Sequence, residues 1–374
     1  MALALVVTGA LAATAVNTPA AFAEEETQAP SVAAGAAQGP QASSNEAQSG
    51  DGLQSGATDE AGDPNPAAVP ESTDDTPATI IVALEDGSVG IPWYRRIFGL
   101  SSQTKHETVK DRIETSVEQA VPGADVTDVA DYAHAFDGFA ISAPASSLEA
   151  IKDTEGVKTA FIERHLKPLV VDDDNAASEV GAVNPGLKNA SSLEMTRANQ
   201  STQKGDKQVI EVIDTGIEAT HQAFSGSMEG VPVRLTQRDV ESLVGKLSHG
   251  KNGAYLNSKI PFVYDYADND ANVLPTSTKD LSHGTHVASI AAANAPDLQG
   301  TAPNAQIIVA KVAADKDGAI PDSTVLAALD DAVIIKPDSI NLSLGDDAGM
   351  GTEAGTVYAE VYKNLAAAGV VSPC

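Results

Sequence analysis

Cysteine is almost absent from this sequence: Cys374 is the only one, so no disulfide within the chain can support the fold. Basic residues are scarce too, with 23 Lys and Arg against 52 Asp and Glu, which gives a formal net charge of -29. We expect no nucleic-acid partner and no binding to anionic lipid, because both surfaces repel an acidic protein. The 374 residues are enough for two folded domains with tails.

Lys and Arg are missing from the whole N-terminal region, where the first basic residue is Arg95. Residues 1–16 are apolar and are followed by an Ala-x-Ala sequence that ends at Ala23. This pattern predicts a secretory signal peptide over 1–23, although without the usual basic start. The apolar span is short and made of small residues, so we expect no integral membrane span after signal removal.

Residues 24–77 contain very few large apolar side chains and are rich in Ala, Gly, Ser, Pro and acids. Such a segment cannot bury enough apolar surface to offset the entropy lost on ordering its backbone. It is therefore predicted to be a disordered acidic linker, and an adhesive role is the alternative.

Alternating helix and strand patterns begin at residue 79 and predict a small α+β domain over 78–168. Val109, Ile113 and Val117 are spaced four apart, as on one face of a helix. Ser146 and Glu149 suggest a capping box at the start of a second, short helix. We expect strands at 79–84, 124–130, 138–142 and 157–162, and helices at 105–120 and 146–152. The order βαββαβ is that of a ferredoxin-like sandwich.

Two polar side chains in the second half suggest catalysis. Asp214 ends an apolar strand at 209–213, and catalytic groups often collect at the carboxyl ends of parallel strands. His283 precedes a helix of small residues at 287–293, which can pack closely against a sheet. A carboxylate that orients an imidazole, which then takes the proton of a hydroxyl, is the acid–base half of a serine nucleophile site. Taken alone, Asp-Thr-Gly can also be an ordinary strand-to-turn junction or an aspartic protease motif, and His-Gly-Thr-His lacks the spacing of a zinc helix.

Four motifs occur in the order and spacing of subtilisin-like serine proteases (peptidase S8), which this chain therefore resembles. They are Val-Ile-Asp-Thr-Gly-Ile (212–217), Ser-His-Gly-Thr-His-Val-Ala (282–288), Gly-Thr-Ala-Pro-Asn-Ala (300–305) and Ser-Ile-Asn-Leu-Ser-Leu-Gly (339–345). Residues 259–268 are most similar to the cell-envelope branch, which includes lactocepin and C5a peptidase. The resemblance implies an α/β fold, a parallel sheet with flanking helices, over 207–374. It also implies Asp214 and His283 as catalytic residues, secretion, and cell-wall association in the full-length form.

The same resemblance assigns roles to the rest of the chain. The sandwich would be an I9-type inhibitory propeptide that chaperones folding, with 164–170 in the substrate cleft and 169–206 as the connection cut on maturation. An independent binding module is the alternative for the sandwich. Ser343, Leu344 and Gly345 would pair with the backbone of protein or peptide substrates, and Gly318 would mark the opposite edge of the cleft. An ordinary strand serine is the alternative for Ser343. His286 is expected to be structural, and His221 and His249 to be loop residues.

Two family features are missing. No Gly-Thr-Ser motif for the nucleophile occurs, and the strand that should carry the oxyanion Asn reaches only Ser372 before the sequence ends. We therefore expect a C-terminally truncated protease that is inactive alone. The alternative is a non-catalytic secreted protein whose sandwich binds, inhibits or chaperones a protease. We expect no cofactor, and the short segment 294–300 lacks the insertion that holds the strong calcium site in classical subtilisins.

Overall fold

The computed structural model describes residues 75–85, 102–169, 193–194, 196–275, 282–346 and 349–372. The predicted signal peptide lies outside these residues, as do almost all of the predicted linker and most of the predicted maturation connection. Within the described part, no helix has both the length and the apolar character needed to cross a bilayer.

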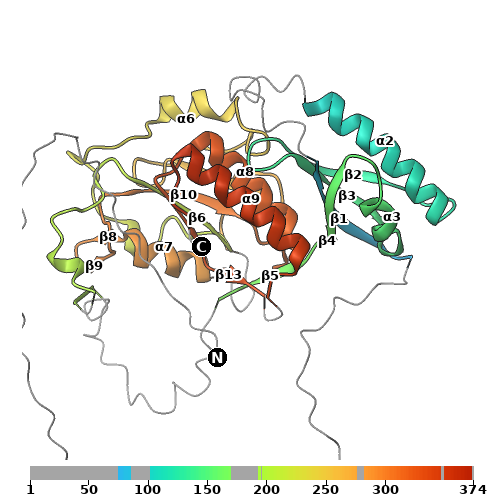
Figure 1. Cartoon of the computed structure of the whole chain (residues 1–374). Helices are drawn as coiled ribbons and strands as arrows, with labels where there is room; N and C mark the ends of the chain where they lie inside the picture. Colours follow the sequence, from blue (N-terminus) through green and yellow to red (C-terminus); the bar gives the residue numbers. More distant parts are fainter. Residues whose placement is uncertain are drawn as a thin grey trace, which may run out of the picture. The chain divides into compact units, whose positions relative to one another are not determined.

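The first folded layer is a four-stranded antiparallel sheet with two helices on one face (Figure 1). Its elements are β1 (Pro77–Leu84), α2 (Ser102–Ala120), β2 (Thr127–Tyr132), β3 (Gly138–Pro144), η1 (Ala145–Ser147), α3 (Leu148–Lys152) and β4 (Val157–Ile162). The strand order β2-β3-β1-β4 and the chain order βαββαβ are those of the predicted sandwich. Ile80 and Val82 of β1 share a buried core with Ile113 and Val117 of α2 and Ile151 of α3. The face of α2 that carries Val109, Ile113 and Val117 is therefore buried, as their spacing predicts.

Two local predictions in this layer are wrong. The second strand begins at Thr127, three residues later than expected, and continues to Tyr132. No capping box starts α3: Ser147 takes the cap position without a side-chain cap bond, and its hydroxyl donates to the Pro144 carbonyl at 2.6 Å. The capping box is absent because residues 145–147 already form the 3₁₀ turn η1, and α3 begins directly after it.

The second layer is a parallel sheet in the order β12-β6-β10-β7, which confirms the predicted fold class. Its elements and connections are η2 (Ala198–Gln200), β6 (Val209–Asp214), η3 (Gln222–Phe224), α6 (Gln237–Val244), β7 (Phe262–Asp265), α7 (His283–Ala292), β8 (Asn294–Ala295), β9 (Leu298–Gln299), β10 (Gln306–Lys311), α8 (Asp322–Ile335), β12 (Ser339–Leu342) and α9 (Thr352–Ala368). Helix α7 shares a core with one face, and α8 and α9 share a core with the other. Parallel sheets are usually covered in this way on both faces.

The two layers share one continuous apolar core. The sandwich sheet turns its second face to α8 and α9, and Ile81, Tyr132 and Phe161 are buried in the same cluster as Leu329 of α8 and Val361 of α9. Tyr132 is fully buried, and its hydroxyl donates to the Ser323 carbonyl at 3.1 Å. Helices α8 and α9 therefore have a sheet on each side.

The start of α8 is capped by the sandwich rather than by its own serine. Serine is a common helix-cap residue, but Ser323 does not cap this helix, which begins at Asp322 with no side-chain cap bond from its own chain segment. Instead the Ser323 amide donates to the Glu163 carboxylate at 2.9 Å. A carboxylate at this place satisfies an open N–H group and interacts favourably with the positive end of the helix dipole.

A histidine clamp holds the turn between β2 and β3. Nδ1 of His106 lies 3.1 Å from Asp131, and Nε2 lies 2.7 Å from Asp137. Both ring nitrogens can donate to carboxylates only when the imidazole is protonated. Burial lowers the pKa of His106, but the two carboxylate hydrogen bonds raise it by more, so it lies above 6.5. The bond from His106 in turn lowers the pKa of Asp131 to about 2.

The clamp predicts a pH dependence of stability. The histidine's contribution is fully present below its unfolded pKa of 6.5 and is lost as the pH rises through the higher folded value. The aspartate's contribution is present above 3.8 and is lost as the pH falls through about 2. His106→Gln should therefore lower the free energy of unfolding by about 1.5 kcal/mol at pH 5 and by much less at pH 9. Urea unfolding at both pH values measures this, with His165→Gln, an exposed histidine, as the control. Equal losses at the two pH values would contradict the clamp.

Candidate active site

Asp214 lies at the carboxyl end of β6, in the middle of the parallel sheet. Its side chain is 1% exposed, and one carboxylate oxygen accepts the Thr215 amide at 2.7 Å. The turn that follows passes through Gly216 at φ +103°, where a Cβ atom would lie 2.5 Å from the Val273 carbonyl oxygen. Only glycine fits both the backbone angle and this close approach.

His283 opens α7 and faces Asp214. Its Nδ1 lies 2.9 and 3.0 Å from the two oxygens of the Asp214 carboxylate, and its side chain is 9% exposed. A carboxylate in this position can accept a proton carried on Nδ1, an arrangement that leaves the lone pair on Nε2. The structure thus brings the two predicted residues together with the spacing that a general-base pair needs.

Short contacts hold the histidine helix against the aspartate turn. The Gly284 amide donates to the Thr215 hydroxyl at 3.1 Å, and the Glu218 amide donates to the Thr285 hydroxyl at 3.0 Å. A Cβ atom on Gly284 would lie only 2.3 Å from the Gly216 carbonyl oxygen and 3.1 Å from Cβ of Asp214. The separation of the Asp214 and His283 side chains therefore depends on a glycine at position 284.

Gly284→Ala should force α7 away from this turn. The obstacle is a backbone oxygen, which cannot move aside cheaply, so we expect a loss of about 2 kcal/mol in the free energy of unfolding. Urea denaturation of the 374-residue chain measures it. Gly245→Ala is the matched control, because its Cβ meets nothing within 4 Å and its φ of -67° suits alanine. If the two variants had equal stabilities, the close approach would not be a constraint.

The segment that follows the sandwich forms the middle strand of a third sheet, which has three strands. This strand, β5 (His165–Pro168), pairs antiparallel with β11 (Ile320–Pro321) on one side and β13 (Leu344–Gly345) on the other. The Leu169 amide then donates to the Ser343 carbonyl at 2.9 Å. A Cβ atom on Gly345 would lie 2.9 Å from the Leu169 side chain, so the glycine makes room for it. The chain's own residues 165–169 thus occupy the groove between two strand edges.

The predicted substrate-edge residues have different positions in this groove. Leu344 and Gly345 pair with Pro168 and Lys167, and Ser343 contributes its carbonyl oxygen. The Ser343 hydroxyl donates to the Asn341 side chain at 3.1 Å. Gly318 lies in a turn at φ +74°, with its amide bonded to the Ala314 carbonyl, and the strand edge itself is β11, two residues further on. A substrate role for these residues remains a prediction.

A buried ion pair joins the start of β5 to the start of α8. The Asp322 carboxylate is fully buried and accepts the Arg164 amide at 2.9 Å, its Nε at 3.0 Å and its Nη2 at 2.8 Å. The Tyr358 hydroxyl of α9 donates to the same carboxylate at 2.7 Å. The sequence patterns did not identify this group, although an Arg two residues after an apolar strand was a usable signal.

Two adjacent carboxylates in the middle of α8 bind backbone amides of two different loops. Asp330 accepts three amides, from residues 133–135 of the sandwich, at 2.7 to 3.2 Å. Asp331 accepts the amides of Ser248 and Gly250 at 2.7 and 2.6 Å. Both acids are fully buried, inside the apolar sequence Ala-Ala-Leu-Asp-Asp-Ala-Val. Acids in such a context are the sequence signal for buried amide partners.

Two other histidines, His221 and His249, lie outside helices and strands, as predicted, and make specific contacts there. The His249 ring lies against Tyr132 of the sandwich at a tilt of 37°, with ring centroids 5.7 Å apart, and its Nε2 lies 3.7 Å from Asp330. His249 lies in a bend between α6 and β7, which confirms the predicted loop position, although its side chain is mostly buried beside this carboxylate. His221 caps η3, because its ring nitrogen accepts the Ala223 amide at 3.2 Å. His286 is exposed on α7, and its structural role stays a prediction.

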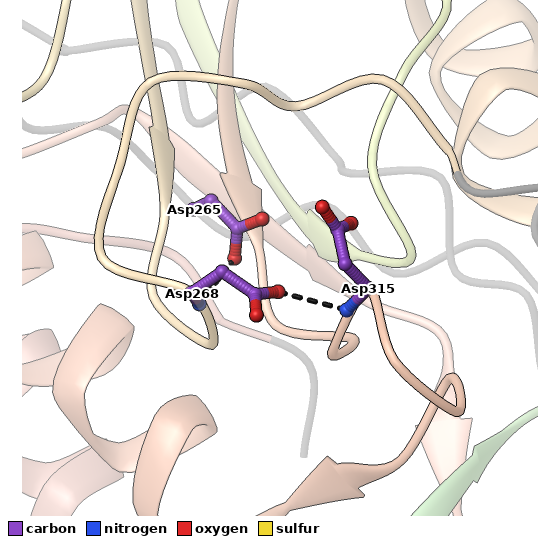
Figure 2. A group of neighbouring side chains, drawn as sticks. All are labelled: Asp265, Asp268 and Asp315. Atoms are coloured by element: carbon purple, nitrogen blue, oxygen red, sulfur yellow. Dashed lines mark hydrogen bonds between the residues drawn. The ribbon is translucent and has the colours of Figure 1, made fainter.

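Three carboxylates lie close together near the Asp214–His283 pair, in an arrangement that can hold a cation. Oxygens of Asp265, Asp268 and Asp315 lie within 4.8 Å of one another (Figure 2). The Lys311 ammonium already lies among them. It contacts Asp265, and its nitrogen is 2.5 Å from Asp315 and 3.7 Å from Asp268. The expected lack of calcium concerned another place, the loop 294–300, where the chain forms the small hairpin of β8 and β9. That expectation stays a prediction.

Comparison with known proteins agrees with this geometry. Residues 205–370 match the model of the subtilase family, peptidase S8. This part of the chain is a subtilase domain. The chain is 32% identical over 229 residues to the PI-type proteinase of Lactococcus lactis subsp. cremoris. This alignment covers 59% of this chain and 11% of that proteinase. It is 29% identical over 153 residues to the C5a peptidase of Streptococcus pyogenes serotype M3. This alignment covers 39% of this chain and 12% of the peptidase.

The matched part of this chain therefore spans only about a tenth of the length of these relatives. Among solved structures, the epidermin leader peptide processing serine protease of Staphylococcus aureus aligns with 79% of this chain and 59% of its own. The identity there is 13% and the TM-score 0.45. The predicted likeness to the cell-envelope proteinases and C5a peptidase is confirmed by the sequence matches.

Proposed function

We propose that this chain is the propeptide and the first part of the catalytic domain of a secreted subtilase endopeptidase. The observation that supports it best is the pairing of His283 Nδ1 with the buried Asp214 carboxylate, at 2.9 Å, where β6 ends. Asp214 orients the imidazole, and Nε2 of His283 takes the proton of a serine hydroxyl and later gives it to the leaving amine.

The nucleophile in this proposal comes from a segment outside the 374 residues, which contain no Gly-Thr-Ser sequence. The attacked carbonyl also needs hydrogen-bond donors for its developing negative charge. The 374-residue chain alone is accordingly proposed to hydrolyse nothing. Substrates are proteins or peptides that bind in extended form between β11 and β13, since that is how residues 165–169 lie.

The sandwich is proposed to act as the inhibitory propeptide. Its support is the position of β5 in the groove, together with the Arg164–Asp322 ion pair and the amide bonds to Asp330. While this strand is in place, an extended substrate has no access to the same backbone edges. Removal of residues up to the connection 169–206 would open the groove.

The test uses the product of the complete reading frame and, separately, the 374-residue chain. We expect the complete product to cleave casein and to lose that activity with a fluorophosphonate, which reacts with activated serines. The shorter chain should leave casein intact over the same period. If the complete product carried no serine motif and cleaved nothing, the protease proposal would fail. The sandwich would then be tested as a binder of other proteases.

A further inference from the structure

Lys311 is the residue beside the catalytic aspartate in the sheet. In the parallel pairing of β10 with β6, Lys311 is the register partner of Asp214, and the next amide, of Val312, donates to the Asp214 carbonyl at 3.0 Å. The two side chains lie on the same face of the sheet, since Val309 and Val212, two residues before each, both pack in the core under α7.

The stem of Lys311 packs against the turn that carries Asp214. Its Cδ and Cγ atoms lie 3.0 and 3.4 Å from the position that a Cβ of Gly216 would occupy. Lys311 is completely buried, so the stem has no room to swing away. The turn therefore has the lysine stem as one wall.

The head of Lys311 is anchored by the three carboxylates of Figure 2. Asp265 is also fully buried, and its other oxygen accepts the amides of Ala267 and Asp268 at 2.9 and 3.0 Å. Asp268 accepts the Asp315 amide at 2.8 Å, so two of the three carboxylates are themselves fixed by backbone bonds. An ammonium with three such partners holds one position.

The loop that supplies two of these carboxylates returns to the other side of the same turn. The Tyr266 amide donates to the Lys311 carbonyl at 2.8 Å, and a few residues later the Val273 carbonyl accepts the Ile217 amide at 2.8 Å. The turn 214–217 is thus enclosed between the lysine stem and the 265–273 loop, and the ammonium ties these two walls together.

We propose that Lys311 is a positioning residue for the Asp214–His283 pair: its anchored side chain fixes the turn that aims the Asp214 carboxylate at His283. It touches neither substrate nor the reacting atoms, and it acts through Gly216. The ammonium supplies the positive charge that three converging carboxylates require, so the group is a locked ion cluster rather than an open cation site. This inference rests on the proposed function, because it assigns a purpose to the pair's geometry.

Lys311→Met tests it in the full 374-residue chain, because methionine keeps most of the stem but removes the charge. The readout is the proton on Nδ1 of His283, observed by NMR in protein with labelled histidine and assigned by its absence in His283→Gln. In the wild type a strong bond to Asp214 should give a far-downfield signal that exchanges slowly with water. In Lys311→Met we expect the signal to move upfield and to exchange at least tenfold faster.

Lys246→Met is the matched control, because it removes an exposed lysine charge and should leave the signal unchanged. Circular dichroism checks that each variant is folded. If Lys311→Met is folded and its His283 signal is that of the wild type, the positioning role is overturned.

A milder variant covers the case in which Lys311→Met does not fold. Asp268→Asn together with Asp315→Asn keeps the ammonium and its buried partner Asp265 but removes two of the three anchors. We expect an intermediate rise in exchange of the Nδ1 proton, and an unchanged rate would overturn the proposal. Absence of the downfield signal in the wild type would instead contradict the Asp214–His283 pairing, and hence the proposed function.

Discussion

Replacing His283 by alanine should lower kcat of the complete protease by about 10⁶-fold. This size is the one known for subtilisin, a relative in the same family, in which loss of the histidine costs nearly as much as loss of the whole triad. The reason applies here because Nε2 of His283 is proposed to be both the base for the serine and the acid for the leaving group. Asp214→Asn should cost less, about 10⁴-fold, because it leaves an imidazole in the wrong tautomer.

Turnover of a chromogenic peptide by the purified, processed enzyme measures both effects. His286→Ala is the matched control, since it lies in the same helix, is exposed and should change kcat by no more than about twofold. A His283→Ala enzyme with more than one hundredth of the wild-type kcat would show that another group serves as the base.

The second large effect is on stability. Asp322→Ala should lower the free energy of unfolding of the 374-residue chain by about 3 kcal/mol, because it leaves Arg164 and the Tyr358 hydroxyl without their shared partner in a mostly buried place. Part of the cost of leaving Arg164 unpaired is recovered, because its side chain is 18% exposed and can bind water. Urea denaturation followed by circular dichroism measures the change.

Glu353→Ala provides the comparison for Asp322→Ala. Glu353 also pairs across the layers, with Lys152 at 3.6 Å, but its side chain is 43% exposed. Exposed ion pairs usually contribute less than about 1 kcal/mol, so this variant should be close to the wild type. If the two variants lost equal free energies of unfolding, the Arg164–Asp322 pair would stabilise the fold no more than an exposed ion pair does.

The pairing of Asp214 with His283 was predictable from sequence because its signals are local. Asp214 ends an apolar strand, His283 starts a helix of small residues, and both lie in short motifs with fixed order. The sandwich was predictable for the same reason, since Val109, Ile113 and Val117 mark one helix face by their spacing alone.

The contacts between layers were not predictable from local patterns. Glu163 caps α8, and Asp330 binds amides nearly 200 residues earlier in the chain. Their partners are backbone groups, which every residue carries, so no residue type in the partner segment reveals them. Serine is a residue type that often caps helices, so the sequence favours Ser323 as the cap. In the folded protein Glu163, which comes from the other layer, has that role instead.

Glu211 shows a related limit. In the sequence it only interrupts the apolar strand before Asp214, whereas in the structure it is completely buried. Burial, helped by the nearby charge of Asp331, raises the pKa of Glu211 to about 8. The side chain is therefore mostly neutral at pH 7, a property set by surroundings that no short pattern describes.

The strand β5 also has a consequence for solubility. β11 and β13 contain only two residues each, and their paired edges are satisfied by β5 alone within the described sheet. If β5 leaves, both edges present unpaired N–H and C=O groups, which attract any extended polypeptide. The resident strand thus also shields the protein from self-association, and a preparation that has lost it should be handled dilute or with a peptide in the groove.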